Sequence, residues 1–470
     1  MKQGELTSLE LVQTALKQLE QLNPSLNALV LKNAENALHQ AEQADFDISQ
    51  GKIRSVLHGI PITIKDNIEV EGLTTTAAFP PFKNNISSSN AALVAKLKEA
   101  GAVVIGKTNL PALTYDLQTN NQLFGRTNNP WNPDHTSGGS SGGCAAAVSS
   151  GISRISFCND SGGSIRIPAH FCGVYGFKAS MGGIDARGII TQTKKKVGQL
   201  RMRTLFSMGI MAQSLSDIKA ALTVVCTPKL HSTSKKERSP SSLKLLWIDE
   251  LKGLEIDSEI KTAMTELRKK LTESGVSIED LAEDQFNFHE TIRLWGHLSN
   301  YETGNELPPL TRSIGHLIMK RKYSKIPMYT DLLKPISAKK YKTLRRRHEQ
   351  IKAQFEKTLS SYDGLILPAS SVLAFPHQKP DRRIGHLGIY TTPLNVNGNP
   401  VQYAIATQSY SLPFNVLESP VACLPIALSK NNLPIGIQLV GKKNFDFDLL
   451  EVAQVLDQLT PSIGRPPIKN

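Results

Sequence analysis

Three residues whose types can together activate a nucleophile have distinctive neighbours in this sequence. Lys65 ends an apolar run, residues 59–65, and Ser140 and Ser164 each lie in a glycine-rich loop. A neutral lysine amine can accept a proton, and one serine hydroxyl can relay that proton from another. These residue types could therefore make a serine nucleophile without a histidine. The chemistry open to such a nucleophile is acyl transfer, and hydrolysis of an amide is one form of it.

Lys65 can act as a base only if burial lowers its pKa toward neutrality. In residues 60–65, isoleucines alternate with other residues, which predicts a strand. We expect a lysine at the end of such a strand to be partly buried. The sequence equally allows a surface ion pair between Lys65 and Asp66, which would keep the amine protonated.

The two serine loops have the composition of backbone turns that bind anions. Residues 138–143 precede a helix-forming run, residues 145–148, so the N–H groups of that loop would lie at the positive end of a helix dipole. In the second loop, Gly162 and Gly163 allow the backbone amides to converge beside the Ser164 hydroxyl. Converging amides form an oxyanion hole, in which one well-placed donor contributes about 3 kcal/mol. Each loop taken alone also fits a flexible turn.

Two other motif matches lack the neighbours that their chemistry needs. Residues 101–108 fit the phosphate-loop pattern GxxxxGK[ST], but a helical segment precedes them and their Val-Val-Ile interior is typical of a strand. Residues 138–142 fit the nucleophile-elbow pattern GxSxG, but turn-forming residues precede them and no downstream histidine has a distinctive setting. We therefore expect neither nucleotide binding nor a Ser-His-Asp triad.

The composition is that of a folded globular protein without a membrane-spanning segment. The chain has 470 residues, of which 40% are hydrophobic and 20% charged. No apolar stretch reaches the roughly 18 residues that a membrane helix needs, and the first residues lack the apolar core of a signal peptide. We expect a cytoplasmic protein. The 5 cysteines include no CxxC pair, so they indicate neither a disulfide framework nor a zinc site.

The formal net charge of +13 could indicate an anionic partner such as RNA or a membrane surface. Part of the excess lies in short clusters at residues 194–196, 235–238, 320–322 and 345–347. These clusters are scattered, and aromatic residues are not interleaved with them as they are in nucleic-acid grooves. We interpret them as solvated surface and expect no nucleic-acid partner.

The order of predicted elements indicates an α/β protein with a mixed, twisted sheet flanked by helices. Helical patterns cover residues 7–22, 90–100, 257–274 and 445–459, and strand patterns cover residues 60–65, 102–105, 243–248 and 362–368. The strand, helix, strand order near the start predicts parallel pairing. Residues 286–360 are helical and basic, and residues 376–403 have a loop composition. We expect a core in residues 1–227, a largely helical insertion on the substrate side in residues 228–400 and a return to the core in residues 401–470.

Over most of its length the sequence resembles the amidase signature family of serine hydrolases. The resemblance is densest in residues 129–178, and it resumes at residues 413–415 and 433–441. Residues 228–400 match weakly, and in this family that region shapes the substrate pocket. The resemblance implies the mixed α/β fold, no metal or organic cofactor, and hydrolysis of a carboxylic amide to an acid and an amine or ammonia.

The resemblance also implies a role for individual residues. Ser164 matches the nucleophile that forms the acyl-enzyme, Ser140 the bridging serine on a cis peptide, and Lys65 the base. Residues 115–131 are similar to the fatty-acid-amide hydrolase branch. By the same resemblance, the oxyanion hole of the family falls on Ser161, Gly162 and Gly163. The pair that braces this loop falls on Asp160 and Arg166. The residue on the acyl side of the site falls on Thr114.

We expect the chain to bind small-molecule amides. We expect no nucleic-acid partner and no membrane span, and the sequence leaves open whether the protein forms a homodimer. The alternative is a glutamine-hydrolysing subunit of a tRNA-dependent amidotransferase, which would have the same triad and would suit the basic charge. That subunit needs protein partners and a glutamine-specific pocket, which residues 228–400 do not reveal. A third alternative is a binding protein without catalysis, and the intact Lys65, Ser140 and Ser164 argue against it.

Overall fold

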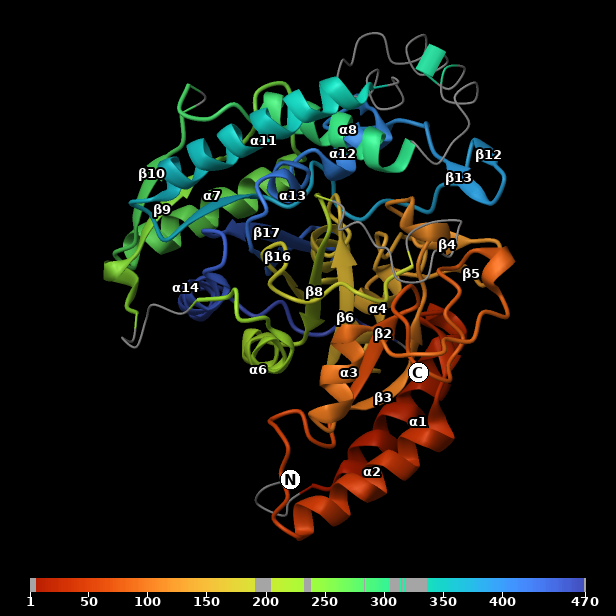
Figure 1. The fold of residues 1–470 in the computed structure, drawn as a ribbon. Helices are drawn as coiled ribbons and strands as arrows, with labels where there is room; N and C mark the ends of the chain where they lie inside the picture. Colours follow the sequence, from red (N-terminus) through yellow and green to blue (C-terminus); the bar gives the residue numbers. More distant parts are fainter. Residues whose placement is uncertain are drawn as a thin grey trace.

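The protein is described here by a computed structural model, which covers residues 6–190, 204–231, 238–282, 284–304 and 336–468, together with residues 313, 316 and 317. At the centre lies a mixed sheet of 11 strands with helices on both faces (Figure 1). The predicted fold class is confirmed. In spatial order the strands are β1 (Leu29–Lys32), β3 (Val103–Thr108), β2 (Pro61–Lys65), β6 (Ile155–Asp160), β8 (Ser207–Ala212), β7 (Tyr175–Lys178), β16 (Val421–Leu428), β17 (Pro434–Val440), β11 (Gly364–Pro368), β9 (Lys244–Trp247) and β10 (Ser277–Asp280).

The direction of pairing changes along the sheet. β2 runs parallel to both β3 and β6, as the strand, helix, strand order predicts. From β6 to β11, through β8, β7, β16 and β17, all neighbours are antiparallel, and β11, β9 and β10 are parallel again. Because β2 has a strand on either side and helices above and below, all five of its residues are buried. This position determines the burial of Lys65, its last residue.

Two sets of helices cover opposite faces of the middle strands. Side chains of successive residues in a strand point to opposite faces. Cys158 and Met211 share a core cluster with α4 and α5, whereas their neighbours Phe157 and Ile210 share one with α6 and α14. The helices concerned are α4 (Gly142–Ser149), α5 (Arg166–Cys172), α6 (Leu215–Val225) and α14 (Asp446–Leu459). The first set includes the two helices that begin directly after the serine loops.

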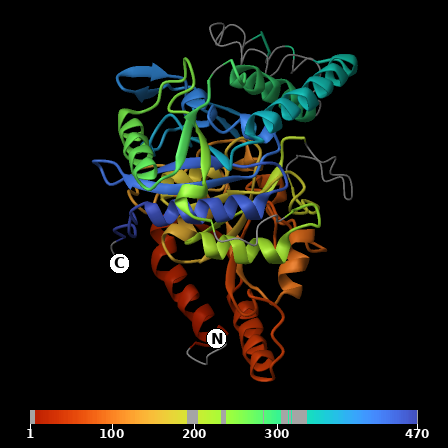
Figure 2. The same ribbon diagram turned by 90° about the vertical axis from the view of Figure 1, so that its left-hand side faces the viewer.

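The N-terminal helices α1 (Ser8–Leu26) and α2 (Ala34–Ser49) pack against each other and extend from one end of the molecule (Figures 1 and 2). Thr7 and Glu10 form the capping box that their spacing predicts. The predicted helix ended at residue 22, whereas the observed helix continues through Pro24 to Leu26. The last turn persists because Leu26 is buried there, and the helix stops at Asn27, which has a left-handed φ of 50°.

The segment that fits the phosphate-loop pattern forms strand β3, and all six residues of the strand are buried. Lys107 is fully buried, and its ammonium group lies 3.2 Å from a carboxylate oxygen of Asp66. The expectation that these residues form a strand is confirmed. A lysine buried in an ion pair inside a sheet cannot reach a bound phosphate, so the nucleotide-binding interpretation is excluded.

Residues 228–400 contribute both strands and helices. Besides β9, β10 and β11 of the main sheet, two small hairpins lie where a loop was expected, and the division of the chain into three parts stays a prediction. Among the described residues, the helices from this segment up to α14 are α7 (Ser258–Glu273), α8 (Phe288–Gly304), α11 (Ala338–Leu359), α12 (Tyr403–Gln408) and α13 (Pro413–Val416). The hairpins pair β12 (Arg382–Ile384) with β13 (Leu387–Ile389) and β14 (Leu394–Val396) with β15 (Asn399–Val401).

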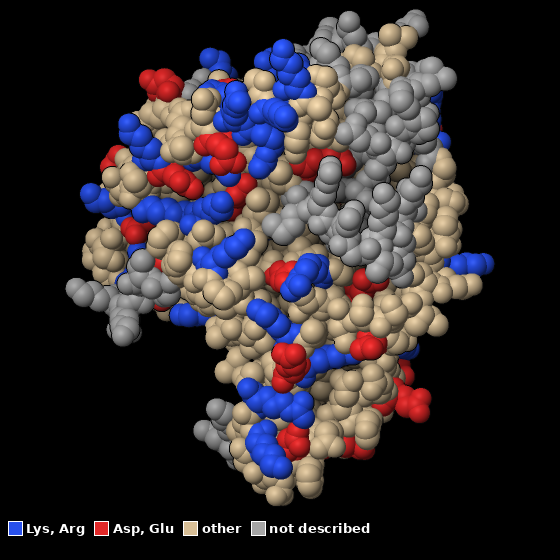
Figure 3. Space-filling model, in the orientation of Figure 1, with Lys and Arg blue, Asp and Glu red and all other residues tan. Residues whose placement is uncertain are grey.

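The surface mixes both signs of charge. On the face in Figure 3, acidic side chains lie among the Lys and Arg side chains. Of the four basic clusters, the one at residues 345–347 is described completely, and there Arg347 forms an ion pair with Glu290 at 2.6 Å. Residues 194–196 and 320–322 and part of 235–238 lie outside the described residues. None of the described helices combines the length and the apolar character that a membrane crossing requires.

An aromatic cluster attaches α11 to the rest of the molecule. The Phe355 ring on α11 lies 5.1 Å from that of Phe286 and 6.2 Å from that of Phe414 on α13, measured between centroids. Phe355 is buried, with an exposure of 2%. The cluster therefore couples the helical segment to residues that directly precede Asn415, a residue of the site described below.

We predict that Phe355→Ala lowers the free energy of unfolding by about 3 kcal/mol or more, because it removes a buried ring and leaves a cavity. Chemical denaturation followed by circular dichroism measures this change. The matched control is Phe46→Ala on α2, because the Phe46 side chain is 59% exposed. Equal midpoints for the two variants would contradict the anchoring role of Phe355.

Candidate active site

Lys65, Ser140 and Ser164 form a continuous chain of hydrogen bonds. The Lys65 Nζ donates to Ser140 Oγ at 2.7 Å, and Ser140 Oγ lies 3.0 Å from Ser164 Oγ. Lys65 ends β2, Ser140 lies just before α4 and Ser164 just before α5. These distances are those of good hydrogen bonds. Three residues from separate parts of the sequence thus meet in an order in which a proton can pass from Ser164 to Lys65.

The amine of Lys65 is fully buried. Burial lowers its pKa to about 8, while the nearby Cys144, Cys158 and Asp160 act in the opposite direction. The Nζ also lies 3.3 Å from Asn159 Oδ1. The prediction that Lys65 is buried is confirmed, and the alternative surface pair is wrong, because Asp66 is itself buried.

Asp66 instead belongs to a separate buried pair. It faces the Lys107 ammonium group and accepts hydrogen bonds from the backbone and side chain of Thr76. With this carboxylate paired elsewhere, Lys65 has no salt-bridge partner within the described part of the chain. A buried lysine without a salt bridge is the kind whose neutral form becomes accessible near neutral pH.

The loop that carries Ser140 is packed tightly against another segment. The Gly139–Ser140 peptide bond is cis. A Cβ atom added at Gly139 would lie 2.7 Å from the backbone carbon of Leu117 and 2.8 Å from the carbonyl oxygen of Asp116. Glycine is therefore required there by close approach of two backbones. The same approach places residues 116–118 directly beside Ser140.

The loop that carries Ser164 is held by the carboxylate of Asp160. The N–H of Gly163 donates to Asp160 Oδ1 at 2.8 Å, and the N–H of Ile165 donates to Oδ2 at 2.9 Å. Gly163 has a φ of 110°, a conformation that favours glycine. The N–H groups of Gly162 and Ser164 have no acceptor within the described residues. These two donors are available to a ligand beside the Ser164 hydroxyl.

Asp160 and Arg166 form a fully buried ion pair, with Arg166 Nη2 2.8 Å from Asp160 Oδ1. Although burial opposes ionisation, the guanidinium holds the pKa of Asp160 well below its ordinary value. Arg166 also donates to the carbonyl of Ser411 at 2.7 Å, to Gln438 Oε1 at 2.9 Å and to Asn415 Oδ1 at 2.6 Å. A buried pair is tolerated when its remaining donors are bonded in this way.

Thr114 is not a member of the hydrogen-bond chain. It ends the short helical turn Ala112–Thr114, is half-buried and has a φ of 66°. Within the described residues, its side chain makes no hydrogen bond to Lys65, Ser140 or Ser164. Its place on the acyl side stays a prediction.

Sequence reasoning missed several residues that surround the serine loop. Trp295 Nε1 on α8 donates to the carbonyl of Ser161 at 2.7 Å. A Cβ atom added at Gly162 would lie 3.1 Å from Trp295, 3.2 Å from Leu412 and 3.4 Å from Gln408 Oε1. These contacts join segments far apart in the chain, so no local pattern could reveal them. The missed Asn415 and Asn159 did have a signal, because they stand in or beside segments that carry the family resemblance.

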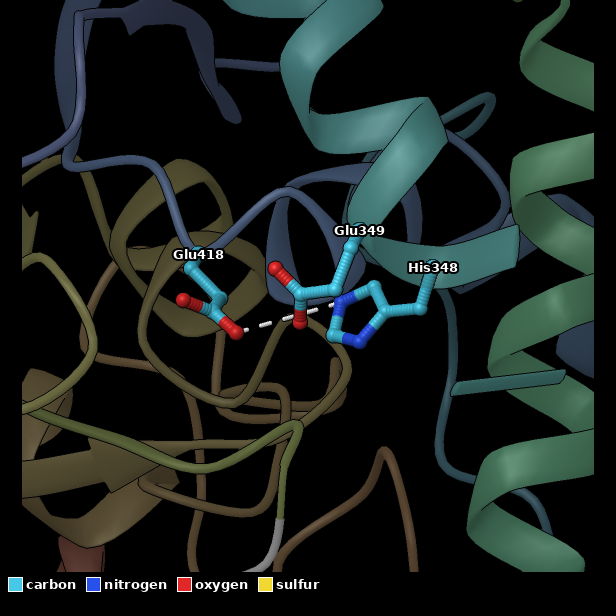
Figure 4. Close-up of side chains that lie close together, drawn as sticks. All are labelled: His348, Glu349 and Glu418. Atoms are coloured by element: carbon cyan, nitrogen blue, oxygen red, sulfur yellow. Dashed lines mark ion pairs between the residues drawn. The ribbon is translucent and has the colours of Figure 1, made fainter. Parts of the chain in front are cut away.

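One cluster outside the site has residue types that bind metals (Figure 4). Single ligand atoms of His348, Glu349 and Glu418 lie within 4.8 Å of one another. However, Lys352 Nζ lies 3.0 Å from Glu418 Oε1 and 2.8 Å from Glu349 Oε2, and Lys443 also contacts Glu418. Ammonium groups therefore already neutralise these carboxylates, so the cluster does not fit a metal ion. It serves as an ion-pair brace between α11 and the turn after α13.

Comparison with known proteins agrees with this geometry. A family model described as Amidase matches residues 10–450. Two proteins named as subunits of glutamyl-tRNA(Gln) amidotransferase are each 30% identical to the chain: that of Desulforamulus reducens over 97% of this chain and 94% of its own length, and that of Nostoc punctiforme over 98% and 96%. A solved structure of fatty acid amide hydrolase has a TM-score of 0.79 at 21% identity and covers 98% of this chain and 84% of its own. At that identity the structural likeness supports the fold alone.

These relatives correct one expectation. The chain was expected to have small-molecule partners, no nucleic acid and at most a second copy of itself. The full-length relatives are subunits of an enzyme named for a tRNA, which contradicts that expectation. The expectation rested on local sequence patterns, and a surface that binds another protein leaves no local pattern comparable to a glycine-rich loop.

Proposed function

Since the chain belongs to the amidase signature family and is a hydrolase of amide C–N bonds, we propose that Ser164 is its nucleophile, Ser140 the relay and Lys65 the base. The observation that carries this proposal is the chain of hydrogen bonds from Lys65 Nζ to Ser164 Oγ, which starts at a fully buried amine. These three side chains can supply every proton transfer that amide cleavage requires.

In the first half of the proposed reaction, Ser164 Oγ attacks the amide carbon. The Ser164 proton moves to Ser140, and the Ser140 proton moves to the neutral Lys65. Lys65 then returns a proton, through Ser140, to the nitrogen of the leaving amine as the C–N bond breaks. An ester of Ser164 remains, and water attacks it with the same relay to release the acid. General base and acid catalysis of this kind contributes about 10²–10⁴-fold to a rate.

The charge that develops on the carbonyl oxygen needs donors. We assign the stabilisation of this charge to the free N–H groups of Gly162 and Ser164, with Ser161 in the same loop. Each well-placed donor contributes about 3 kcal/mol. The N–H of Gly163 is already bonded to Asp160, so the part of Gly163 is to give the loop its shape. Asp160 and Arg166 hold that shape without contacting the substrate.

For the substrate, the curated relatives favour glutamine over a simple amide. They match over nearly their whole length and are named as subunits of an amidotransferase. We therefore propose that the chain is the subunit that hydrolyses glutamine to glutamate and ammonia, in complex with other proteins that act on tRNA. A free-standing amidase with the same mechanism is the second candidate. Work on tRNA would place the protein in the cytoplasm.

The nucleophile can be tested by covalent labelling. We predict that a fluorophosphonate probe labels Ser164 in the native protein, and that Ser164→Ala abolishes both labelling and amide hydrolysis while the protein stays folded. Peptide mass spectrometry identifies the labelled residue. Ser141→Ala is the control, because this serine lies in the same loop as Ser140 but outside the hydrogen-bond chain. Persistent turnover by Ser164→Ala would refute the assignment.

The pH dependence tests the base. Because only the neutral amine of Lys65 accepts a proton and its pKa is about 8, kcat/KM should rise with pH and level off above roughly pH 8. Below that pH it should fall about tenfold per unit, since the neutral fraction falls tenfold. The profile is measured from pH 6 to 10 with an uncharged amide. A flat profile would show that Lys65 is not the titrating base.

The two substrate candidates differ in their need for partners. We predict that the tagged full-length chain, isolated from its own cells, copurifies with other proteins. Glutamate release from glutamine should be at least tenfold faster in that complex than with the isolated chain. An assay of glutamate release on both preparations distinguishes the two candidates. If the isolated chain hydrolyses simple amides as fast as the complex and does not act on glutamine, the second candidate is correct.

A further inference from the structure

One carboxylate close to the candidate active site has no cation beside it in the described part of the chain. The buried Asp66, Asp160 and Glu418 are each paired with a lysine or arginine. Asp116 differs, because within the described residues its only hydrogen bonds come from neutral groups. The Tyr403 hydroxyl donates to Oδ1 at 3.0 Å and the N–H of Gln118 to Oδ2 at 3.3 Å.

Asp116 stands beside the reacting serines. Its carbonyl oxygen is among the atoms that would touch a Cβ at Gly139, and Ser140 is the next residue. Leu117 and Gln118 are buried, whereas Asp116 is partly exposed. Part of the residue is thus open to solvent, although its carboxylate is largely buried.

The two ends of helix α12 contact Asp116 and the loop that carries Ser164. Its first residue, Tyr403, binds Asp116, and its last residue, Gln408, lies against Gly162. At 1.5 Å per residue, five steps along a helix cover about 8 Å. Since three bonds of an extended chain span about 3.5 Å, that length corresponds to roughly seven bonded atoms, the size of one small substrate.

Two tyrosines lie near the carboxylate, one bonded to it through its hydroxyl and the other stacked on the first. Tyr390 stacks on Tyr403 with 5.5 Å between the ring centroids and 24° between the planes. The faces of tyrosine rings attract cations. Burial raises the pKa of Asp116 to about 7, which reflects the missing cation. Arg383 acts electrostatically on Tyr390, but no ion pair joins Arg383 to Asp116 within the described residues.

We propose that Asp116, together with Tyr403 and Tyr390, binds a primary ammonium group of the amide substrate and so determines specificity. The inference rests on the proposed function and narrows its substrate class to amides that carry a second, cationic amino group. Glutamine, with its α-ammonium group, belongs to that class. Asp116 takes no part in proton transfer at Ser164.

The experiment compares 5-aminopentanamide with pentanamide, which has the same acyl chain without the charge. Asp116→Asn should raise the KM of the charged amide about tenfold or more and leave kcat near its original value, because a charge-assisted contact is lost. The KM of pentanamide should not change. Asparagine retains an oxygen that can accept from Tyr403, so the variant should keep its melting temperature.

Two further variants sharpen the comparison. Tyr403→Phe retains the ring and removes the hydroxyl, and it should raise the KM of the charged amide by a smaller factor than Asp116→Asn. Asp134→Asn removes an exposed carboxylate and should leave the KM of both amides unchanged. If the native protein turns over neither amide, calorimetry with butylammonium chloride replaces kinetics, and Asp116→Asn should weaken that binding about tenfold or more.

The outcomes separate this inference from the proposed function. If Asp116→Asn affects both amides equally, or leaves binding of the charged compound unchanged, the ammonium subsite is wrong while hydrolysis at Ser164 stands. If no amide is cleaved and the fluorophosphonate does not label Ser164, the proposed function fails. Butylammonium binding that depends on Asp116 would still support the subsite in that case.

Discussion

The hydrogen bond between a fully buried lysine amine and Ser140 is the contact on which the rest of the site depends. Lys65 and Lys107 lie on adjacent strands and are equally buried. Lys107 faces Asp66, which stabilises its charge, whereas Lys65 meets a hydroxyl and an amide oxygen. Burial without a salt bridge favours the neutral amine. Burial lowers the pKa of both lysines, and the two differ in their direct partners, because only Lys107 forms an ion pair with a carboxylate.

A second constraint holds the loop that carries Ser164. The Asp160–Arg166 pair is buried, and its remaining donors are satisfied by Ser411, Asn415 and Gln438, residues from the last part of the chain. Removing one partner of such a pair leaves an uncompensated charge, which costs several kcal/mol. The loop is therefore stable only when the C-terminal strands and α13 are in place. This explains why the family resemblance resumes at residues 413–415, far from the serines.

The proposed reaction and the proposed recognition of the substrate use different parts of the fold. The hydrogen-bond chain comes from β2, the third strand of the sheet, and from the loops before α4 and α5. The groups around it come from elsewhere: Trp295 from α8, Gln408 from α12 and Asp116 from the segment packed on Gly139. A change in those outer segments can alter the accepted amide without moving the serines.

The sequence alone determined the α/β class, most element positions and the three residues that meet at the site, because periodicity and glycine-rich loops are local properties. Only the tertiary structure decided that Lys65 is buried while Asp66 pairs with Lys107, that α1 continues past Pro24 and that hairpins occupy the expected loop after residue 376. It also revealed Trp295 and Asp116 beside the serines. Each of these depends on contacts between residues distant in the chain, whose energies no local pattern encodes.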